Sequence, residues 1–320
     1  MLLTIVIPVY NSQETIGFLV ERLLEMSVAY ILEVVLVDDG SQDGSSRVCE
    51  DLARRFQDNV VFVQLARNFG EHNAVMAGLT YARGERVVVM DDDLQNPPEA
   101  VQLLNDAMSD GEYDVVYSKY TRKRNKLWRN AGSWFNNLAS TLMLGKPYHL
   151  YLSSFKIMSR FAVNQVIDYR GPFPYIDGLL LQSMSRIGTV VVPHEKRLAG
   201  KSAYTLMKLI SLWLNTFTNF SVFPLRLAFL LGLMGAIGGL VLVGTLVFER
   251  FAQSGLPTGY LYMMTVIIFF SSAMLVVSGL VGEYVGRILL NVNSKPQFVV
   301  RRLVAHGEDR MAEVSPMIKR

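Results

Sequence analysis

Three consecutive aspartates, Asp91, Asp92 and Asp93, follow directly on the apolar run Arg86–Met90 and precede Gln95 by one residue. Adjacent carboxylates repel one another, so such a run is destabilising unless a cation is bound. Mg²⁺ and Mn²⁺ prefer oxygen ligands and share their remaining positions with water and substrate phosphates. Asp91 and Asp93 point to the same side of an extended segment, and Gln95 can add a neutral oxygen. We therefore predict a Mg²⁺ or Mn²⁺ site here, with a solvated acidic turn as the alternative.

A second acidic cluster, Asp38 and Asp39, ends the apolar run Glu33–Val37. A carboxylate at this position can accept hydrogen bonds from the imino or amino group of a nucleobase. Asp43 is explained more simply as the cap of the next helix. The first apolar run ends in Ile7-Pro8-Val9-Tyr10-Asn11, which adds an aromatic ring and an amide. Together these residue types predict a nucleotide pocket beside the metal site.

A nucleotide site also needs groups that hold phosphate. The sequence contains no GxxxxGK[ST] loop and no GxGxxG after a strand, which argues against P-loop and dinucleotide-binding proteins. The segment that begins at Arg197 offers instead two cations and a hydroxyl, from Arg197, Lys201 and Ser202. Guanidinium suits bidentate phosphate contact. The alternative is a basic turn that touches lipid headgroups, and the basic run Arg122–Arg129 would attract the same headgroups or a lipid phosphate.

The elements that must position these residues alternate between strand and helix. Apolar β-branched runs predict strands, and the spacing of the apolar residues from Ile16 to Leu24 predicts a helix. The prolines of 96–99 are typical of a helix start. Continuous apolar strands separated by helices indicate a mostly parallel sheet of the α/β class, whose ligands bind at the carboxyl ends of the strands. The predicted strands are Leu3–Val9, Glu33–Val37, Val60–Leu65, Arg86–Met90 and Asp114–Tyr117.

Two long uncharged stretches follow this part of the chain, and each is long enough to cross a membrane. Spans of about 227–248 and 261–282 meet the need for about 20 apolar residues. A pair of buried core helices is the alternative. Arg226 on one flank, and Arg287 with Lys295 on the other, predict by the positive-inside rule that both flanks are cytoplasmic. With no signal peptide before Leu2, and with Cys49 as the one cysteine, we expect a multi-pass protein of the inner membrane with a cytoplasmic catalytic domain.

These patterns divide the chain into four parts. Residues 1–203 are predicted to form the catalytic domain and 204–225 an amphipathic helix in the membrane interface, or else a helix packed on that domain. Residues 226–290 are predicted to form the transmembrane hairpin, and 291–320 a cytoplasmic basic tail that lacks order after about Ala305. A net charge of +3 on a membrane-tied chain argues against nucleic-acid binding.

Taken together, the motifs resemble the family-2 glycosyltransferases with the GT-A fold, and within them the polyprenyl-phosphate group. The resemblance covers roughly residues 3–303, and its most specific part is the aspartate run with the Leu-Gln-Asn-Pro-Pro-Glu that follows it. The weaker segments are Ile7–Asn11, Asp38–Ser41, Arg67-Asn68-Phe69-Gly70, Gly200–Tyr204 and Gly282–Arg287.

The resemblance implies a role for each candidate residue. Metal binding falls to Asp91, Asp93 and Gln95; catalysis to Asp93 and Arg197; the lipid phosphate or diphosphate to Arg197, Lys201 and Ser202. The nucleotide is implied to contact Pro8, Tyr10, Asn11, Asp39, Asp91 and Asp92. Three positions depart from the family pattern: Ser12 and Ser154 stand where acids are usual, and Ala203 where a lysine is frequent.

The chemistry expected from this resemblance is a single displacement with inversion, from a nucleotide sugar to a polyprenyl phosphate such as undecaprenyl phosphate. A phosphate monoester is already anionic at neutral pH, so the missing acid at Ser154 does not remove a needed base. Closeness to the bacterial members favours UDP over GDP, and the family suggests a homo-oligomer. The open alternatives are another lipid or polysaccharide acceptor and a non-catalytic membrane scaffold with a degenerate transferase domain.

Overall fold

The computed structural model describes residues 2–26, 31–120, 150–171, 174–193, 259–292 and 296–311, and parts of 228–248. The chain divides into two compact units. One consists of Met1–Tyr204 together with Ser294–Arg320, and the other of Thr205–Asn293. Most of the predicted site residues belong to the first unit.

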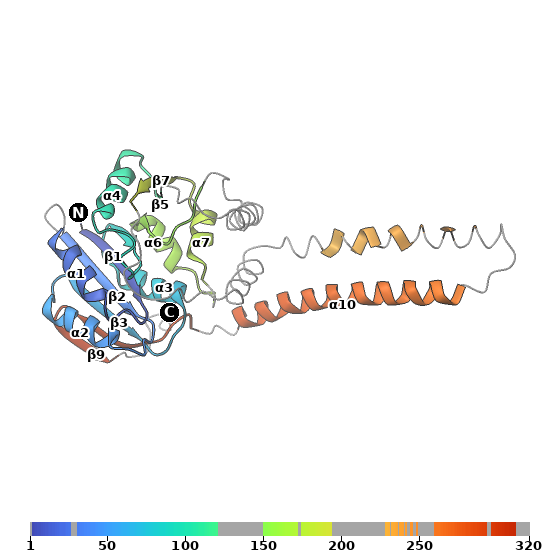
Figure 1. The fold of residues 1–320 in the computed structure, drawn as a ribbon, viewed down its shortest axis with the longest axis horizontal. Helices are drawn as coiled ribbons and strands as arrows, with labels where there is room; N and C mark the ends of the chain where they lie inside the picture. The colour runs from blue at the N-terminus through green and yellow to red at the C-terminus, as the bar shows by residue number, and fades with distance from the viewer. Residues whose placement is uncertain are drawn as a thin grey trace. The chain divides into compact units, whose positions relative to one another are not determined.

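A nine-stranded sheet of order β7-β5-β6-β4-β1-β2-β3-β8-β9 forms the centre of the first unit (Figure 1). The four central strands β4, β1, β2 and β3 pair in parallel, and among the nine only β6 and β8 run against the rest. The sheet is thus large and mostly parallel, as predicted. The strands are β1 Leu2–Val9, β2 Ile31–Asp38, β3 Val60–Leu65, β4 Arg86–Val89, β5 Val115–Tyr120, β6 Lys156–Ser159, β7 Ile187–Val192, β8 Val300–Ala305 and β9 Glu308–Met311.

Helices cover both faces of this sheet. The buried residues Leu3, Ile5 and Ile7 of β1 belong to one core with the apolar faces of α1, α2 and α4. On the opposite face α3 packs directly on β1 and β2 through Gly78. The described helices of this unit are α1 Ile16–Glu25, α2 Ser45–Arg55, α3 Glu71–Tyr81, α4 Ala100–Asp110, α6 Arg160–Ile167 and α7 Ile176–Ser183. Successive side chains of β1 point to opposite faces of the sheet, so both faces are apolar and both are covered by helices.

The five predicted strands, and the helix predicted from Ile16 to Leu24, agree with the structure to within three residues at each end. The prolines of 96–99 immediately precede α4, and the amide of Ala100 donates to the carbonyl of Pro97. The strands β6, β7, β8 and β9 were not predicted. The strand β6 is only four residues long, and β8 carries two arginines, so neither shows the apolar pattern of a buried strand.

The predicted basic tail of 291–320 contains two strands of the sheet, β8 and β9. Residues Ser294–Arg320 belong to the same compact unit as the amino-terminal part. The strand β8 pairs antiparallel with β3, and β9 pairs with β8, so order continues past Ala305. Val300 and Val304 are buried, while Arg301 is exposed and Arg302 is half-buried. The valines help to hold β8 between β3 and β9, and the basic composition had hidden this strand.

The second unit contains α10, Gly259–Val292, of 34 residues. Within the described residues it is the one helix long and apolar enough to cross a membrane, with its most apolar window at Phe269–Gly286. The predicted span of 261–282 lies inside α10. A shorter apolar helix, Ala228–Gly239, falls in the first predicted span. The predicted interfacial helix of 204–225 lies outside the described residues.

The close approach of α3 to β1 generates a stability prediction. A Cβ added at Gly78 would lie 2.3 Å from Cγ1 of Val6 and 3.1 Å from Cγ2 of Val37. We expect Gly78→Ala to lower the free energy of unfolding by about 1–3 kcal/mol through overpacking. Gly17→Ala on α1 is the matched control, because its Cβ would meet nothing nearer than 3.7 Å. In detergent, the melting temperature of Gly78→Ala should therefore be lower than that of Gly17→Ala. Equal melting temperatures would refute this packing.

Candidate active site

The aspartate run emerges where β4 meets the end of β1. The amide of Met90 still donates to the carbonyl of Val6 at 3.0 Å, so Asp91 is the first residue beyond the sheet. The carboxylate of Asp92 turns towards the end of β1: its Oδ2 accepts from the Tyr10 amide at 3.2 Å and from the Ser12 hydroxyl at 2.5 Å. The carboxylate of Asp91 accepts at 2.6 Å from the hydroxyl of Ser154, just before β6. Neighbouring aspartates are thus held by different strands.

The electrostatics of the run reflect its burial. The pKa of Asp91 is raised to about 6, first by burial and then by the charges of Glu71 and Asp93, against the hydrogen bond from Ser154. The pKa of Asp92 is also raised to about 6, again first by burial, against hydrogen bonds from Ser12 and Tyr10. Both carboxylates therefore lie in surroundings where negative charge is unfavourable. A bound cation would compensate that charge.

The residues of this run fit a divalent cation whose coordination shell is completed by oxygens of the substrate. Within the part of the chain that the structure describes, no group of three or more His, Cys, Asp and Glu could enclose a metal. Mg²⁺ and Mn²⁺ do not require one, since one or two carboxylates with substrate phosphates and water suffice. Asp91 keeps its Oδ1 outside the bond from Ser154, and Asp93 accepts from the Gln95 amide at 3.1 Å through Oδ1. Asp92 serves instead as a link to β1.

The carboxylate of Asp39 lies directly after β2, the strand that pairs with β1 on the side away from β4. It is buried, and its two oxygens accept from the amides of Phe69 at 2.7 Å and Gly70 at 2.9 Å. Burial raises the pKa of Asp39, with the two amide bonds opposing the shift. Each carboxylate oxygen has a second lone pair, which leaves capacity for a nucleobase donor.

The turn after Asp39 permits only glycine. Gly40 has φ +71°, and a Cβ there would lie 2.6 Å from the Asn68 nitrogen and 2.7 Å from the Arg67 carbonyl carbon. The loop Arg67–Gly70 therefore packs against the backbone of this turn. Sequence reasoning quoted the loop as a weak motif and assigned it no role. Its contacts identify it as the support of Asp39.

The remaining nucleotide candidates gather around the same loops. Pro8 lies in β1 opposite Val37, and the ring of Tyr10 is 44% exposed. Asn11 adopts φ 55°, and its side-chain oxygen accepts from the Gln42 amide at 2.8 Å. These contacts join the ends of β1 and β2.

Asp43 lies just before α2, whose N-cap is Gly44. Its carboxylate accepts from the amide of Ser45 at 2.9 Å and from the amide of Gln13 at 3.2 Å. These bonds lower the pKa of Asp43. A group so engaged has little capacity left for a ligand.

The phosphate candidates Arg197, Lys201 and Ser202 lie outside the described residues, as does the basic run of 122–129. A buried cation that sequence reasoning missed, Lys156, acts on the aspartates. Lys156 of β6 forms an ion pair with Asp177 and lies 5.4 Å from the ring centroid of Tyr117. Its charge lowers the pKa of Asp91 and so offsets part of the repulsion within the run. The available signal was a lysine placed between the apolar residues Phe155 and Ile157.

Comparison with known proteins agrees with this geometry. Residues 4–167 match the model of Glycosyl transferase family 2. The chain is 34% identical over 308 residues to the undecaprenyl-phosphate 4-deoxy-4-formamido-L-arabinose transferase of Yersinia enterocolitica, covering 94% of this chain and 93% of that protein. The chain belongs to glycosyl transferase family 2. The transferase of the same name from Pseudomonas fluorescens is 34% identical, with 94% and 89% covered.

Among solved structures, this family-2 glycosyltransferase is similar in fold to glucosyl-3-phosphoglycerate synthase from Mycobacterium tuberculosis in complex with Mn²⁺ and UDP-glucose. The TM-score is 0.50 at 18% identity, and the match covers 68% of this chain and 76% of that chain. At this identity the likeness concerns the fold. It extends the family assignment to a GT-A-like α/β architecture.

The hydrogen bonds of Asp92 generate a prediction about pH. Both bonds end on Oδ2, so an amide oxygen in its place keeps them while the buried charge is lost. Folding raises the pKa from 3.8 to about 6, so ionisation of Asp92 lowers the free energy of unfolding as pH rises through this range. We expect Asp92→Asn, without divalent cations, to be more stable at pH 7.5 by on the order of 2 kcal/mol.

Melting curves across pH 4 to 8 measure this effect. Near pH 4 both proteins carry a neutral side chain at this position, so their stabilities should converge there. Asp110→Asn, at the exposed end of α4, is the control and should follow the wild type throughout. An Asp92→Asn curve parallel to the wild type at every pH would contradict the assignment of a buried charge.

Proposed function

We propose that this glycosyltransferase moves a sugar from a UDP-linked donor to undecaprenyl phosphate at the cytoplasmic face of a membrane, with Mg²⁺ or Mn²⁺. The observation that carries the proposal is the convergence of Asp91, Asp92 and Asp39 at the carboxyl ends of adjacent parallel strands. That edge is where open α/β sheets bind ligands. Burial makes the ionised form of these carboxylates unfavourable, and a bound cation would offset that cost. The polar loop beside them can contact a nucleotide, so the edge suits a cation together with a nucleotide.

The acceptor is supported by the relatives. The proteins from Yersinia and Pseudomonas are named for undecaprenyl phosphate, and the match covers nearly the whole of both chains. Similarity over nearly the whole length of this chain supports the same acceptor class. The donor and the cation draw support from the synthase that was crystallised with Mn²⁺ and UDP-glucose.

The proposed reaction depends more on the alignment of donor and acceptor than on a general base. A bound cation would neutralise the leaving diphosphate as charge develops on it. Asp91 and Asp93 are the residues that would hold the cation, and Asp39, Tyr10 and Asn11 would orient the nucleoside. Arg197, Lys201 and Ser202 are proposed to hold the phosphate groups. The acceptor phosphate is itself the nucleophile, so no side chain has to remove a proton.

Two of the three departures from the family pattern, Ser12 and Ser154, had suggested a degenerate, non-catalytic scaffold. Their contacts favour an active site instead, because each hydroxyl donates to one of the half-buried aspartates Asp92 and Asp91. A scaffold has no need to orient carboxylates in an unfavourable environment. We therefore retain the transferase.

The membrane hairpin is part of the proposal. In α10 large apolar side chains such as Phe269, Met274 and Leu275 are more than 60% exposed. Exposed apolar surface of this extent favours contact with lipid. A second span of about 227–248, with cytoplasmic basic flanks, would place the loop between them outside.

A transfer assay tests the function. Purified protein is incubated with undecaprenyl phosphate, Mg²⁺ or Mn²⁺, and a panel of UDP- and GDP-sugars, with dolichyl phosphate and free polysaccharide as competing acceptors. We expect one UDP-sugar to be transferred to the lipid and chelation to abolish transfer. Loss of the cation's charge stabilisation in Asp93→Asn should lower kcat/KM by about 10²-fold or more, with Asp110→Asn as control. Undiminished transfer by Asp93→Asn would exclude the proposed metal site.

Reporter fusions test the hairpin. Alkaline phosphatase joined after Ser254 should be active, because the loop between the spans is outside. The same enzyme joined after Lys295 should be inactive, and a cytoplasmic reporter should give the reverse pattern. Cytoplasmic reporters active at both positions would leave no room for two spans.

A further inference from the structure

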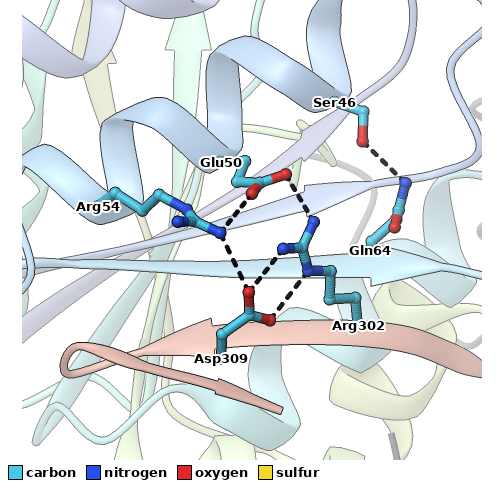
Figure 2. A network of polar contacts seen from close by, with 6 residues as sticks. All are labelled: Ser46, Glu50, Arg54, Gln64, Arg302 and Asp309. Carbon is cyan, nitrogen blue, oxygen red and sulfur yellow. Dashed lines mark hydrogen bonds and ion pairs between the residues drawn. The ribbon is translucent and has the colours of Figure 1, made fainter. Parts of the chain in front are cut away.

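A ladder of polar contacts joins the part of the chain that follows α10 to the edge of the sheet. Three residues of α2, each four after the last, contact three successive strands (Figure 2). Ser46 accepts from Gln64 of β3 at 2.8 Å, and Glu50 accepts from Arg302 of β8 at 2.7 Å. Arg54 donates to Asp309 of β9 at 3.1 Å. Residues four apart lie on one face of a helix, so α2 lies across all three strands.

Arg302 is the centre of this ladder. Its guanidinium forms a bidentate contact with Asp309, at 2.9 and 2.5 Å, besides its bond to Glu50. It lies opposite Gln64 in the β3–β8 register, so the two neighbours reach α2 side by side. Only 26% of its side chain is exposed. A bidentate pair inside a network is better defined than a lone surface ion pair.

The same strand reaches the loop that supports Asp39. After a shift in register at Gln64 and Leu65, the amide of Ala66 donates to the carbonyl of Val299 at 2.8 Å. The next residues are the loop Arg67–Gly70, whose amides hold both oxygens of Asp39. Without β8, β3 would be an edge strand with unpaired amides. The strand that returns after α10 thus fixes the end from which this loop departs.

Other contacts of the returning segment fix it independently. Gln297 is buried and donates to the carbonyls of Tyr169 and Gly171, both at 2.8 Å. Phe298 is also buried. The segment is therefore docked on both sides of Val299. A rigid partner is what a positioning role requires.

We propose that β8, through Arg302 and the Val299 carbonyl, positions the loop Arg67–Gly70 so that Asp39 can bind the donor nucleotide. Arg302 is a positioning residue, since it acts through α2 and β3 and touches no reacting atom. The inference rests on the proposed function for the identity of the nucleotide. It goes beyond that function by making the chain beyond the apolar helix part of the donor site.

Hydrogen exchange in the full-length protein tests the positioning without reference to any substrate. In Arg302→Ala the amides of Ala66, Phe69 and Gly70 should exchange about threefold faster or more, while the centre of β1 stays unchanged. Arg302→Lys should partly restore protection. Arg310→Ala is the matched control, since Arg310 pairs with Glu308 of its own strand β9. If Arg302→Ala does not fold, Glu50→Ala removes the same link from the side of α2.

Donor kinetics complete the test. We expect Arg302→Ala to raise the KM for the nucleotide sugar, and the Kd of UDP with Mn²⁺, by about threefold or more, with kcat and the KM of the lipid nearly unchanged. Unaltered exchange at 66–70, acceleration spread equally over β1, or an unchanged donor KM would each overturn the proposal. A wild type that transfers no sugar would refute the proposed function instead, and the exchange result would still decide the role of β8.

Discussion

The parallel pairing of β1 with β2 and β4 is the constraint on which the rest of the structure depends. It brings the carboxyl ends of these three strands to one edge, and each end carries acids or polar groups: Tyr10 and Asn11, Asp38 and Asp39, and the run from Asp91. Parallel strands need covered faces, which α1, α2 and α3 supply. The packing of Gly78 against β1 and the buried apolar core therefore serve the site, since they hold the strand ends in register.

The gathering of carboxylates at this edge of the sheet creates repulsion between negative charges. Several carboxylates that are partly removed from water repel one another, and the chain answers with short polar contacts: Ser12 to Asp92, Ser154 to Asp91, and backbone amides to Asp39. The buried Lys156 adds a positive charge nearby. The compensation is incomplete, because the pKa values of Asp91 and Asp92 stay raised. A cation bound at this edge would compensate the negative charge that remains.

The order of the sheet also links distant parts of the chain. The strands β8 and β9 lie beside β3, although the whole second unit separates them in sequence. The ladder along α2 and the pairing at Val299 join this returning segment to the loop beneath Asp39. The segment that follows the apolar helix is therefore part of the glycosyltransferase domain.

The sequence by itself determined the α/β class, the five apolar strands, the apolar length of α10 and the aspartates that the site uses, because these depend on local pattern and composition. Only the tertiary structure decided the partners of each carboxylate, the support of Asp39 by the 67–70 loop and the incorporation of β8 and β9. These depend on contacts between residues tens to hundreds of positions apart, such as Arg302 with Glu50. In the sequence, Arg301 and Arg302 look like part of a basic tail. Only the pairing of β8 with β3 and the bond from Arg302 to Glu50 of α2 show that they belong to the sheet.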